Sequence, residues 1–228
     1  MSRRFSAGEE LEGYLSVTKL VDSDHPLVRA AALKVVGEAE TPKDAAVRIS
    51  SFVRDKIPLA IVNPWKTASE TLRMRKGSCL TKATLQVALL RSVGIPARFR
   101  VVEFKGNDPA EWLGIVPSFS VSRLPERWSH IFGEVYIEGR WIMADATFDK
   151  ALVPDTDDWD GEKDVCCIAP EAVLADLGAF VSIDEEARKL DAAYRAPVFW
   201  IINGYRTFWL LNLYEKMQRL KNRLKRLP

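Results

Sequence analysis

The feature of this sequence that most constrains its fold is a helix predicted to be apolar over most of its circumference. Residues 78–92 read SCLTKATLQVALLRS, and their apolar side chains fall on most sides of a helix. Gly94 stands where a C-terminal cap belongs, and Pro96 prevents the helix from continuing. Such a helix must be surrounded by other elements, so the pattern predicts a central, largely buried helix.

Helical patterns fill the chain before this helix. Apolar side chains recur at helical spacing within residues 26–36. The run TPKD at 41–44 predicts the start of another helix, with a capping threonine, a proline at the first position and an aspartate that can complete a capping box. Pro58 ends that helix. Residues 1–60 are therefore predicted to be N-terminal helices of the same domain.

Strand patterns follow the central helix. Residues 97–105 have the pattern of one strand, and residues 131–137 and 140–147 have that of a hairpin around Glu138-Gly139. Residues 106–129 have no clear period and are predicted to be a loop or an insertion. The order of elements predicts an α+β fold in which the central helix packs on an antiparallel β-sheet.

The pattern changes again after the hairpin. Helical signals return at residues 170–177, 184–194 and 198–227. A chain of 228 residues suits one domain with appendages. We therefore expect a core over residues 61–165 and a C-terminal helical appendage over residues 166–228.

The composition is that of an ordinary soluble globular protein. Hydrophobic residues make up 47% of the chain and charged residues 28%. The 33 basic and 31 acidic side chains leave a net charge of +2, so nothing global indicates nucleic acid or an acidic substrate as a partner.

The number of cysteines and the length of the apolar runs indicate the cellular compartment of the protein. Three cysteines are a sparse, odd number, which argues against a disulfide scaffold and is compatible with a reducing compartment. The N-terminus lacks the continuous apolar region of a signal peptide, and no run of 18 apolar residues predicts a transmembrane helix. We therefore expect a cytoplasmic protein.

Cys79 opens the central helix, directly after Gly77-Ser78. A thiol in that position lies at the positive end of the helix dipole and beside free N–H groups, and both favour the nucleophilic thiolate. The alternative is a small apolar core residue, which is what most cysteines are. Position alone leaves both interpretations open.

The predicted hairpin brings a histidine and a carboxylate together. Of the two histidines, His25 lies in a helix-start context and is better explained as structural or exposed, whereas His130 opens a strand. A symmetric turn at residues 138–139 places Thr147 opposite His130 and Asp145 diagonal to it on the same face. A carboxylate there can fix the imidazole tautomer and stabilise its cation. The alternative is that Asp145 only ends the strand and caps a turn.

Three segments then form an ordered set of motifs: GSCLTKATLQVALLRSVGIPAR at 77–98, SHIFGEVYIEGRW at 129–141 and DATFD at 145–149. Together they resemble the transglutaminase-like superfamily, whose core is related to papain. The run TASETL at 67–72 is also similar to that family, and the resemblance covers about residues 40–150. It implies a catalytic core over residues 61–165 with a triad of Cys79 as nucleophile, His130 as base and Asp145 as orienting carboxylate.

The resemblance also implies an activity. Cys79 would attack an amide or ester carbonyl of a protein or peptide substrate, and the acyl group would pass to water or to an amine. We expect a peptidase or amidase that hydrolyses amide bonds through a thioester acyl-enzyme, without a cofactor. The alternatives are a true transglutaminase, which transfers a glutaminyl acyl group to an amine, and a catalytically silent binding domain on the same fold.

Such chemistry needs an oxyanion hole, in which one donor is worth about 3–4 kcal/mol. The backbone N–H of Cys79 is one candidate, and the indole of Trp65 is another, since an upstream tryptophan plays that role in part of the family. The alternative for Trp65 is packing in the core or in a groove. Leu80 and Phe132 depart from the residues common in the family, and both departures concern the rim of the site, so they leave the substrate open.

Two candidate metal sites are weaker. Six acidic residues crowd residues 155–164, but the register around Gly161 fails the EF-hand pattern, so a solvated acidic loop explains them better. Cys166 and Cys167 could join Cys79 and His130 as zinc ligands, but adjacent cysteines lack the usual gap between ligands. We therefore expect no metal.

The C-terminal stretch, residues 198–227, is predicted to be amphipathic. One helical face carries Trp209, Leu210, Leu213, Met217, Leu220 and Leu224, and lysines and arginines crowd the remainder. Such a helix could lie on an anionic membrane surface. It could also pack on the core or on a second subunit with its charges solvated, and packing is the interpretation we favour.

Overall fold

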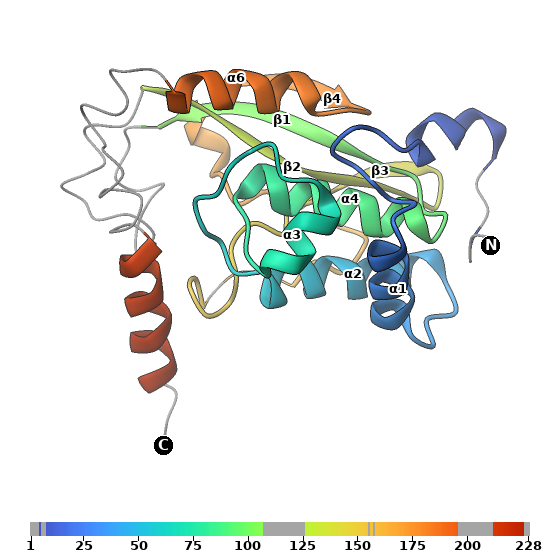
Figure 1. Ribbon diagram of the computed structural model, residues 1–228, viewed down its shortest axis with the longest axis horizontal. Coiled ribbons are helices and arrows are strands. Elements are labelled where there is room, and N and C mark those ends of the chain that lie inside the picture. The colour runs from blue at the N-terminus through green and yellow to red at the C-terminus, as the bar shows by residue number, and fades with distance from the viewer. Residues whose placement is uncertain are drawn as a thin grey trace.

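The computed structural model of the chain describes residues 5, 8–106, 126–154, 156, 158–195 and 212–225. After a short 3-10 helix (Glu9–Leu15), this part contains α1 (Pro26–Val36), α2 (Pro42–Lys56), α3 (Ala68–Met74) and α4 (Cys79–Ser92). α4 lies between the other three helices and a four-stranded sheet (Figure 1). Twelve of its fourteen residues are buried, which confirms the predicted central helix.

The helix starts follow from caps in the sequence. Before α2, the hydroxyl of Thr41 accepts a hydrogen bond from the backbone N–H of Asp44. At α4, the hydroxyl of Thr81 accepts one from the N–H of Ser78. These bonds satisfy donors that a helix leaves unpaired at its start, and they fix where each helix begins.

The sheet is antiparallel and has the order β3-β2-β1-β4. Its strands are β1 (Ala97–Lys105), β2 (Arg127–Ile137), β3 (Arg140–Ala144) and β4 (Val173–Phe180). β2 and β3 form the predicted hairpin, with Ile137 opposite Arg140. Both turn residues, Glu138 and Gly139, have positive φ, as a two-residue turn between twisted strands requires. The predicted α+β fold is confirmed.

Two boundaries differ from the sequence prediction. β3 ends at Ala144 instead of Thr147, because the N–H of Asp145 turns to the carbonyl of Val165. β2 begins at Arg127, so His130 lies inside a strand and not at its start. Residues 107–125 of the predicted loop lie outside the described residues.

The helix predicted at residues 170–177 is wrong. A 3-10 turn (Pro170–Ala172) leads instead into β4, which pairs with the edge of β1. Local helical preference is weak, and the backbone hydrogen bonds that this edge offers outweigh it. The helix predicted at 184–194 is confirmed as α6 (Asp184–Arg195).

A buried arginine joins α4 to the sheet. The guanidinium of Arg91 donates to the backbone carbonyls of Ala97, Ser16 and Val181. Burial lowers the pKa of Arg91 to about 10, so the side chain remains charged at neutral pH. These bonds hold α4 at a fixed position against β1 and the segment after β4.

A C-terminal helix, residues 212–224, stands at one end of the molecule (Figure 1, red). The earlier part of the predicted C-terminal stretch, residues 198–211, lies outside the described residues. Within the described part of the chain, none of the helices combines the length and apolarity needed to span a bilayer.

Candidate active site

His130 on β2 is hydrogen-bonded to the first residue after β3. Its Nε2 lies 2.7 Å from Oδ2 of Asp145, and both side chains are buried. The predicted pairing of the two side chains is confirmed. The predicted cross-strand pair of His130 and Thr147 does not form, because β3 ends at Ala144.

Three hydrogen bonds fix the carboxylate of Asp145. Oδ2 also accepts the backbone N–H of Cys167 at 2.9 Å, and Oδ1 accepts that of Thr147 at 2.9 Å. Burial alone would raise the pKa of Asp145, but His130 and these hydrogen bonds outweigh it and hold the pKa well below its usual range. Asp145 is therefore a charged, fixed acceptor for the imidazole.

The imidazole of His130 is held by its neighbours on the strand face. Phe132 stacks on it with ring centroids 5.5 Å apart, and Phe104 meets it edge-on at 6.5 Å. Burial opposes the charged imidazole, but the carboxylate of Asp145, through its charge and its hydrogen bond, outweighs burial and raises the pKa of His130 well above its usual range. Within the described residues Nδ1 has no hydrogen-bond partner, so it is the ring nitrogen left for a reacting group.

Cys79 is the first residue of α4 and is half-buried, with a free thiol. One turn later, Nζ of Lys82 donates to the carbonyl of Thr147 at 2.7 Å. One turn further, Nε2 of Gln86 donates to the carbonyl of Ala144 at 2.8 Å. Residues three and four apart share a helix face, so Cys79 begins the face that contacts these carbonyls. This face of α4 is turned toward the segment that carries Asp145.

The turn before Cys79 is tight. A Cβ on Gly77 would lie 2.5 Å from Oγ1 of Thr81, which only glycine avoids. The first intrahelical hydrogen bond runs from the N–H of Lys82 to the carbonyl of Ser78. The N–H of Cys79 therefore belongs to the first turn, where donors have no intrahelical acceptor, and it can serve an oxyanion.

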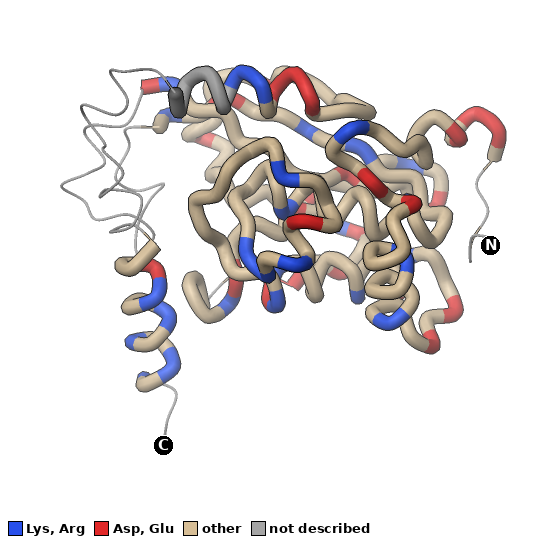
Figure 2. Tube along the Cα trace, viewed as in Figure 1, with Lys and Arg blue, Asp and Glu red and all other residues tan. Residues whose placement is uncertain are grey.

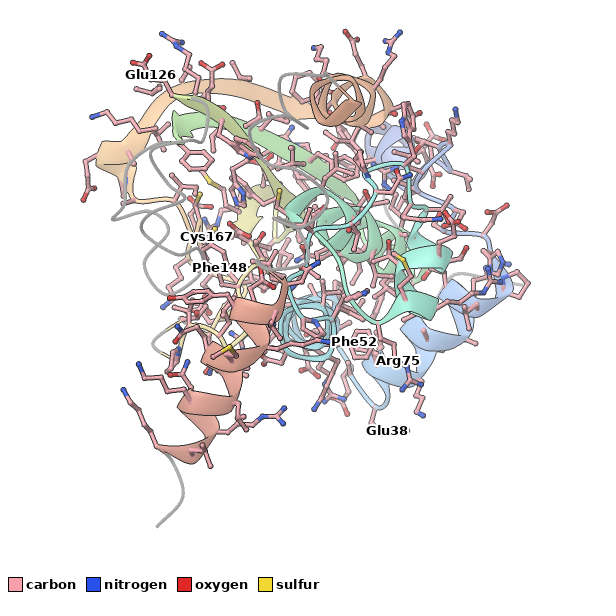
Figure 3. All side chains as sticks on the ribbon, turned by 60° about the vertical axis from the view of Figure 1, so that its left-hand side comes forward. Glu38, Phe52, Arg75, Glu126, Phe148 and Cys167 are labelled. Carbon is pink, nitrogen blue, oxygen red and sulfur yellow. The ribbon has the colours of Figure 1, made fainter. Side chains whose placement is uncertain are left out.

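Cys167 is the residue at this site that the sequence did not place. Its Sγ lies 3.3 Å from Nε2 of His130. Cys167 lies beside His130 because Val165, two residues before it, forms a parallel bridge with Ala144 at the end of β3. Burial and the charge of Asp145 raise the pKa of Cys167 well above its usual range, so its sulfur is a neutral thiol at neutral pH. Figure 3 shows Cys167 beside the strand ends, above the C-terminal helix.

Residues 29–146 match the profile of the transglutaminase-like superfamily, and this span contains Cys79, His130 and Asp145. The chain belongs to the transglutaminase-like superfamily. The resemblance noted in its three motifs is confirmed.

One solved structure shares the fold of this chain. A protein from Cytophaga hutchinsonii, provisionally assigned as a cysteine protease, superposes with a TM-score of 0.55 at 20% identity over 82% of this chain and 50% of that one. A protein from Parabacteroides distasonis, provisionally assigned as a protease, has a TM-score of 0.38 at 13% identity over 58% of this chain and 25% of that one. The chain thus spans half the length of the first structure. A search of curated proteins finds no match.

Three ligand atoms of this transglutaminase-like site could surround a metal ion. Those of His130, Asp145 and Cys167 lie within 4.8 Å of one another. Both oxygens of Asp145 already accept hydrogen bonds from N–H groups, and Nε2 of His130 already faces the carboxylate. These bonds account for the cluster without an ion.

A buried lysine lies beneath the site. Nζ of Lys82 donates to the carbonyls of Thr147 and Arg54. Burial lowers its pKa to about 7, although the carboxylates of Asp149 and Asp145 oppose the shift. Hydrophobic periodicity does not predict that this lysine is buried within an apolar helix.

Trp65 is partly buried at the edge of the core. It packs against the core, and Nζ of Lys19 lies 4.9 Å from its ring centroid. Among the described residues it lines a groove with Phe180 and the first turn of α6, and the three predicted triad residues do not line that groove. Packing in a groove describes these contacts, and a role in the oxyanion hole stays a prediction.

The carboxylates of the acidic loop are divided among separate partners. Asp158 contacts Arg54 and Lys150. Asp160 accepts two backbone N–H groups of its own turn, and Asp164 accepts that of Met143. Positions 155 and 157 lie outside the described residues.

Proposed function

We propose that this protein is a cysteine-dependent acyl-transfer enzyme that hydrolyses amide or peptide bonds through a thioester at Cys79. The observation that carries the proposal is the buried hydrogen bond between His130 and Asp145. A carboxylate on Nε2 fixes the tautomer and leaves Nδ1 to act as the base toward a nucleophile. The free thiol at the start of α4 is the nucleophile that this arrangement suits.

The reaction would begin from a thiolate–imidazolium pair, in which Nδ1 of His130 holds the proton of the Cys79 thiol, in agreement with the raised pKa of His130. The sulfur forms a bond to the carbonyl carbon, and the carbonyl π electrons move onto the oxygen, where the backbone N–H of Cys79 can stabilise the negative charge. The C–N bond then breaks, and the imidazolium returns the proton to the leaving amine. The product of this half-reaction is a thioester on Cys79.

Water completes the cycle. His130 takes a proton from water as its oxygen attacks the thioester, and the C–S bond breaks to release the acid and the thiol. Asp145 stabilises the imidazolium in both half-reactions, in agreement with the raised pKa of His130. A primary amine in place of water would make the same acyl-enzyme a transglutaminase.

Cys167 is less suited to the role of nucleophile. It faces Nε2, the nitrogen that Asp145 already occupies, and its raised pKa keeps it protonated. A cysteine nucleophile must also stay reduced, so we infer a reducing compartment such as the cytoplasm.

Labelling with iodoacetamide followed by peptide mapping tests the nucleophile. In the native chain we expect Cys79 to react at least ten times faster than Cys166. In the His130→Ala variant we expect Cys79 to react only as fast as it does in the unfolded chain. His25→Ala, at the other histidine, is the matched control and should leave the rate unchanged. Labelling of Cys79 no faster than in the unfolded chain would favour a catalytically silent binding domain.

A glutamine-containing peptide with a primary amine in the buffer separates hydrolysis from transfer. We expect release of the acid at a rate that the amine does not change, and loss of all turnover in Cys79→Ala. Incorporation of the amine into the peptide as the main product would identify a transferase instead.

A further inference from the structure

The C-terminal helix docks on the body of the protein through its polar face. Arg219 forms an ion pair with the buried carboxylate of Asp149, with Nη2 2.8 Å from Oδ2, and also donates to the carbonyl of Leu59. Glu215, one turn earlier, is buried beside Arg219. The strongest polar contacts of the helix are therefore directed inward.

Two asparagines on the same face extend this docking. The side chain of Asn212 exchanges hydrogen bonds with the backbone N–H and C=O of Ile61. The side chain of Asn222 donates to the carbonyls of Ala151 and Leu152. A helix anchored at both ends has a fixed orientation about its own axis.

The opposite face is apolar and points away from the body. Its side chains recur at helical spacing and have exposed fractions of 37–60%: Leu213, Met217, Leu220 and Leu224. The apolar face predicted from the sequence exists over these residues, but it is not the face that packs. A helix on a globular core normally has the reverse arrangement.

Lysine and arginine predominate along this helix (Figure 2), and its exposed charged residues are all basic. Within the described residues, its four exposed cations form no ion pair: Lys216, Lys221, Arg223 and Lys225. The one carboxylate of the helix, on Glu215, is buried and does not offset them. The surface thus combines an apolar stripe with a cationic border.

We propose that this face of residues 213–225 docks on an anionic lipid surface, with the helix lying in the plane of the bilayer interface. Apolar side chains would enter the boundary between headgroups and acyl chains, and the flanking cations would contact lipid phosphates. The apolar stripe and the cationic border would then both contact lipid, while the polar face of the helix stays bound to the rest of the protein.

Charge complementarity favours a lipid surface over a second copy of the chain. A two-fold contact through this face would place its cations against the same cations of the partner, with no exposed carboxylate on the helix to pair with them. The preceding residues 198–211, VFWIINGYRTFWLL, are in addition rich in Trp, Tyr and Phe, the residues typical of membrane interfaces.

The docking surface would also be linked to the candidate active site. Leu59, which Arg219 contacts, forms a bridge with Gly77, two residues before Cys79. Asp149 follows Asp145 by four residues. Docking would therefore hold the site close to the bilayer, where substrates at the membrane surface are within reach.

Flotation of the full chain with lipid vesicles tests the proposal. We expect binding to vesicles of phosphatidylcholine that contain phosphatidylglycerol, weak binding to phosphatidylcholine alone, and a loss of binding as salt rises. The double variant Leu220→Asp/Leu224→Asp should bind at least tenfold more weakly. Lys221→Gln and Arg223→Gln should each reduce binding about fivefold, as expected for one cation near an anionic surface.

Leu33→Asp is the matched control, because Leu33 is also an exposed leucine and lies on a different helix. It should leave vesicle binding unchanged, and the melting temperature of each variant checks its fold. Cys79→Ala should also bind normally, which separates this inference from the proposed activity. Equal binding by the Leu220→Asp/Leu224→Asp variant, no binding by the native chain, or a dimer in sedimentation that this variant abolishes would overturn the proposal.

Discussion

Nε2 of His130 lies 2.7 Å from Oδ2 of Asp145, at the level where β3 has ended and β2 continues. The end of β3 frees the side chain of Asp145 to turn toward the imidazole. The backbone N–H of Cys167 donates a second hydrogen bond to the same oxygen. The three segments together hold the carboxylate in one orientation without contact to bulk water.

Asp145→Asn should abolish most of the activity while preserving the fold. An amide can turn its NH2 group to Nε2, which favours the wrong tautomer and cannot stabilise the imidazolium. We expect turnover of a peptide substrate to fall by about 10²-fold or more. Asp160→Asn, in the exposed acidic loop, is the control. Retention of more than half the native turnover by Asp145→Asn would contradict the assigned role.

His130 should titrate well above the usual histidine range. The chain has two histidines, so proton NMR of the native and His25→Gln proteins assigns each imidazole signal. Because Asp145 raises the pKa of His130, the Asp145→Asn variant should move its midpoint downward. A Cys167→Ala background removes the thiol that contacts Nε2 of His130. An unchanged midpoint in Asp145→Asn would exclude the carboxylate as the cause.

The same shift should appear in the stability of the protein. A histidine with a raised pKa in the folded state contributes its full stabilisation below about pH 6.5 and loses it as the pH rises through the folded value. The free energy of unfolding from urea titrations should thus fall above neutral pH in the native chain. The fall should be smaller in Asp145→Asn.

The sequence predicted the elements whose signals are local. α4 follows from its all-round apolar pattern, and the register of the hairpin follows from the two-residue turn at 138–139. That register was enough to bring Asp145 to His130. The prediction made β3 three residues too long. The strand ends earlier because the backbone N–H of Asp145 donates to the carbonyl of Val165.

The features that the sequence missed depend on contacts between distant residues. Cys167 reaches His130 through the parallel bridge between Ala144 and Val165, and no local pattern indicates that bridge. The orientation of the C-terminal helix depends on the pair of Arg219 and Asp149, 70 residues apart. Hydrophobic periodicity places the apolar face of that helix inward, whereas the buried ion pair and the hydrogen bonds of Asn212 and Asn222 turn its polar face inward.

Gly77→Ala should reduce both stability and activity. The new Cβ would lie 2.5 Å from Oγ1 of Thr81, so the start of α4 must shift and Cys79 with it. We expect a loss of about 1–3 kcal/mol in the free energy of unfolding, typical of overpacking. The iodoacetamide rate of Cys79 should also fall. Gly13→Ala, where a Cβ meets no atom within 4 Å, should change neither quantity, and equal behaviour of the two variants would contradict the steric argument.

Glu215 should destabilise the folded protein at neutral and alkaline pH. Its Oε2 is buried without a hydrogen-bond partner and lies 3.6 Å from Nη1 of Arg219. Burial raises the pKa of Glu215 to about 8, while Arg219 opposes the shift.

Below about pH 4.5 this carboxyl group is protonated in both states and has no effect on stability. As the pH rises from 4.5 to 8, ionisation of Glu215 favours the unfolded chain, so stability falls. Glu215→Gln removes this ionisation and should stabilise the protein by on the order of 2–4 kcal/mol at pH 8, with little change at pH 4.5. Urea unfolding at both pH values measures the difference, with the exposed Glu171→Gln as the control. A destabilising effect of Glu215→Gln at pH 8 would show that the charged carboxylate stabilises the docking of the C-terminal helix through Arg219.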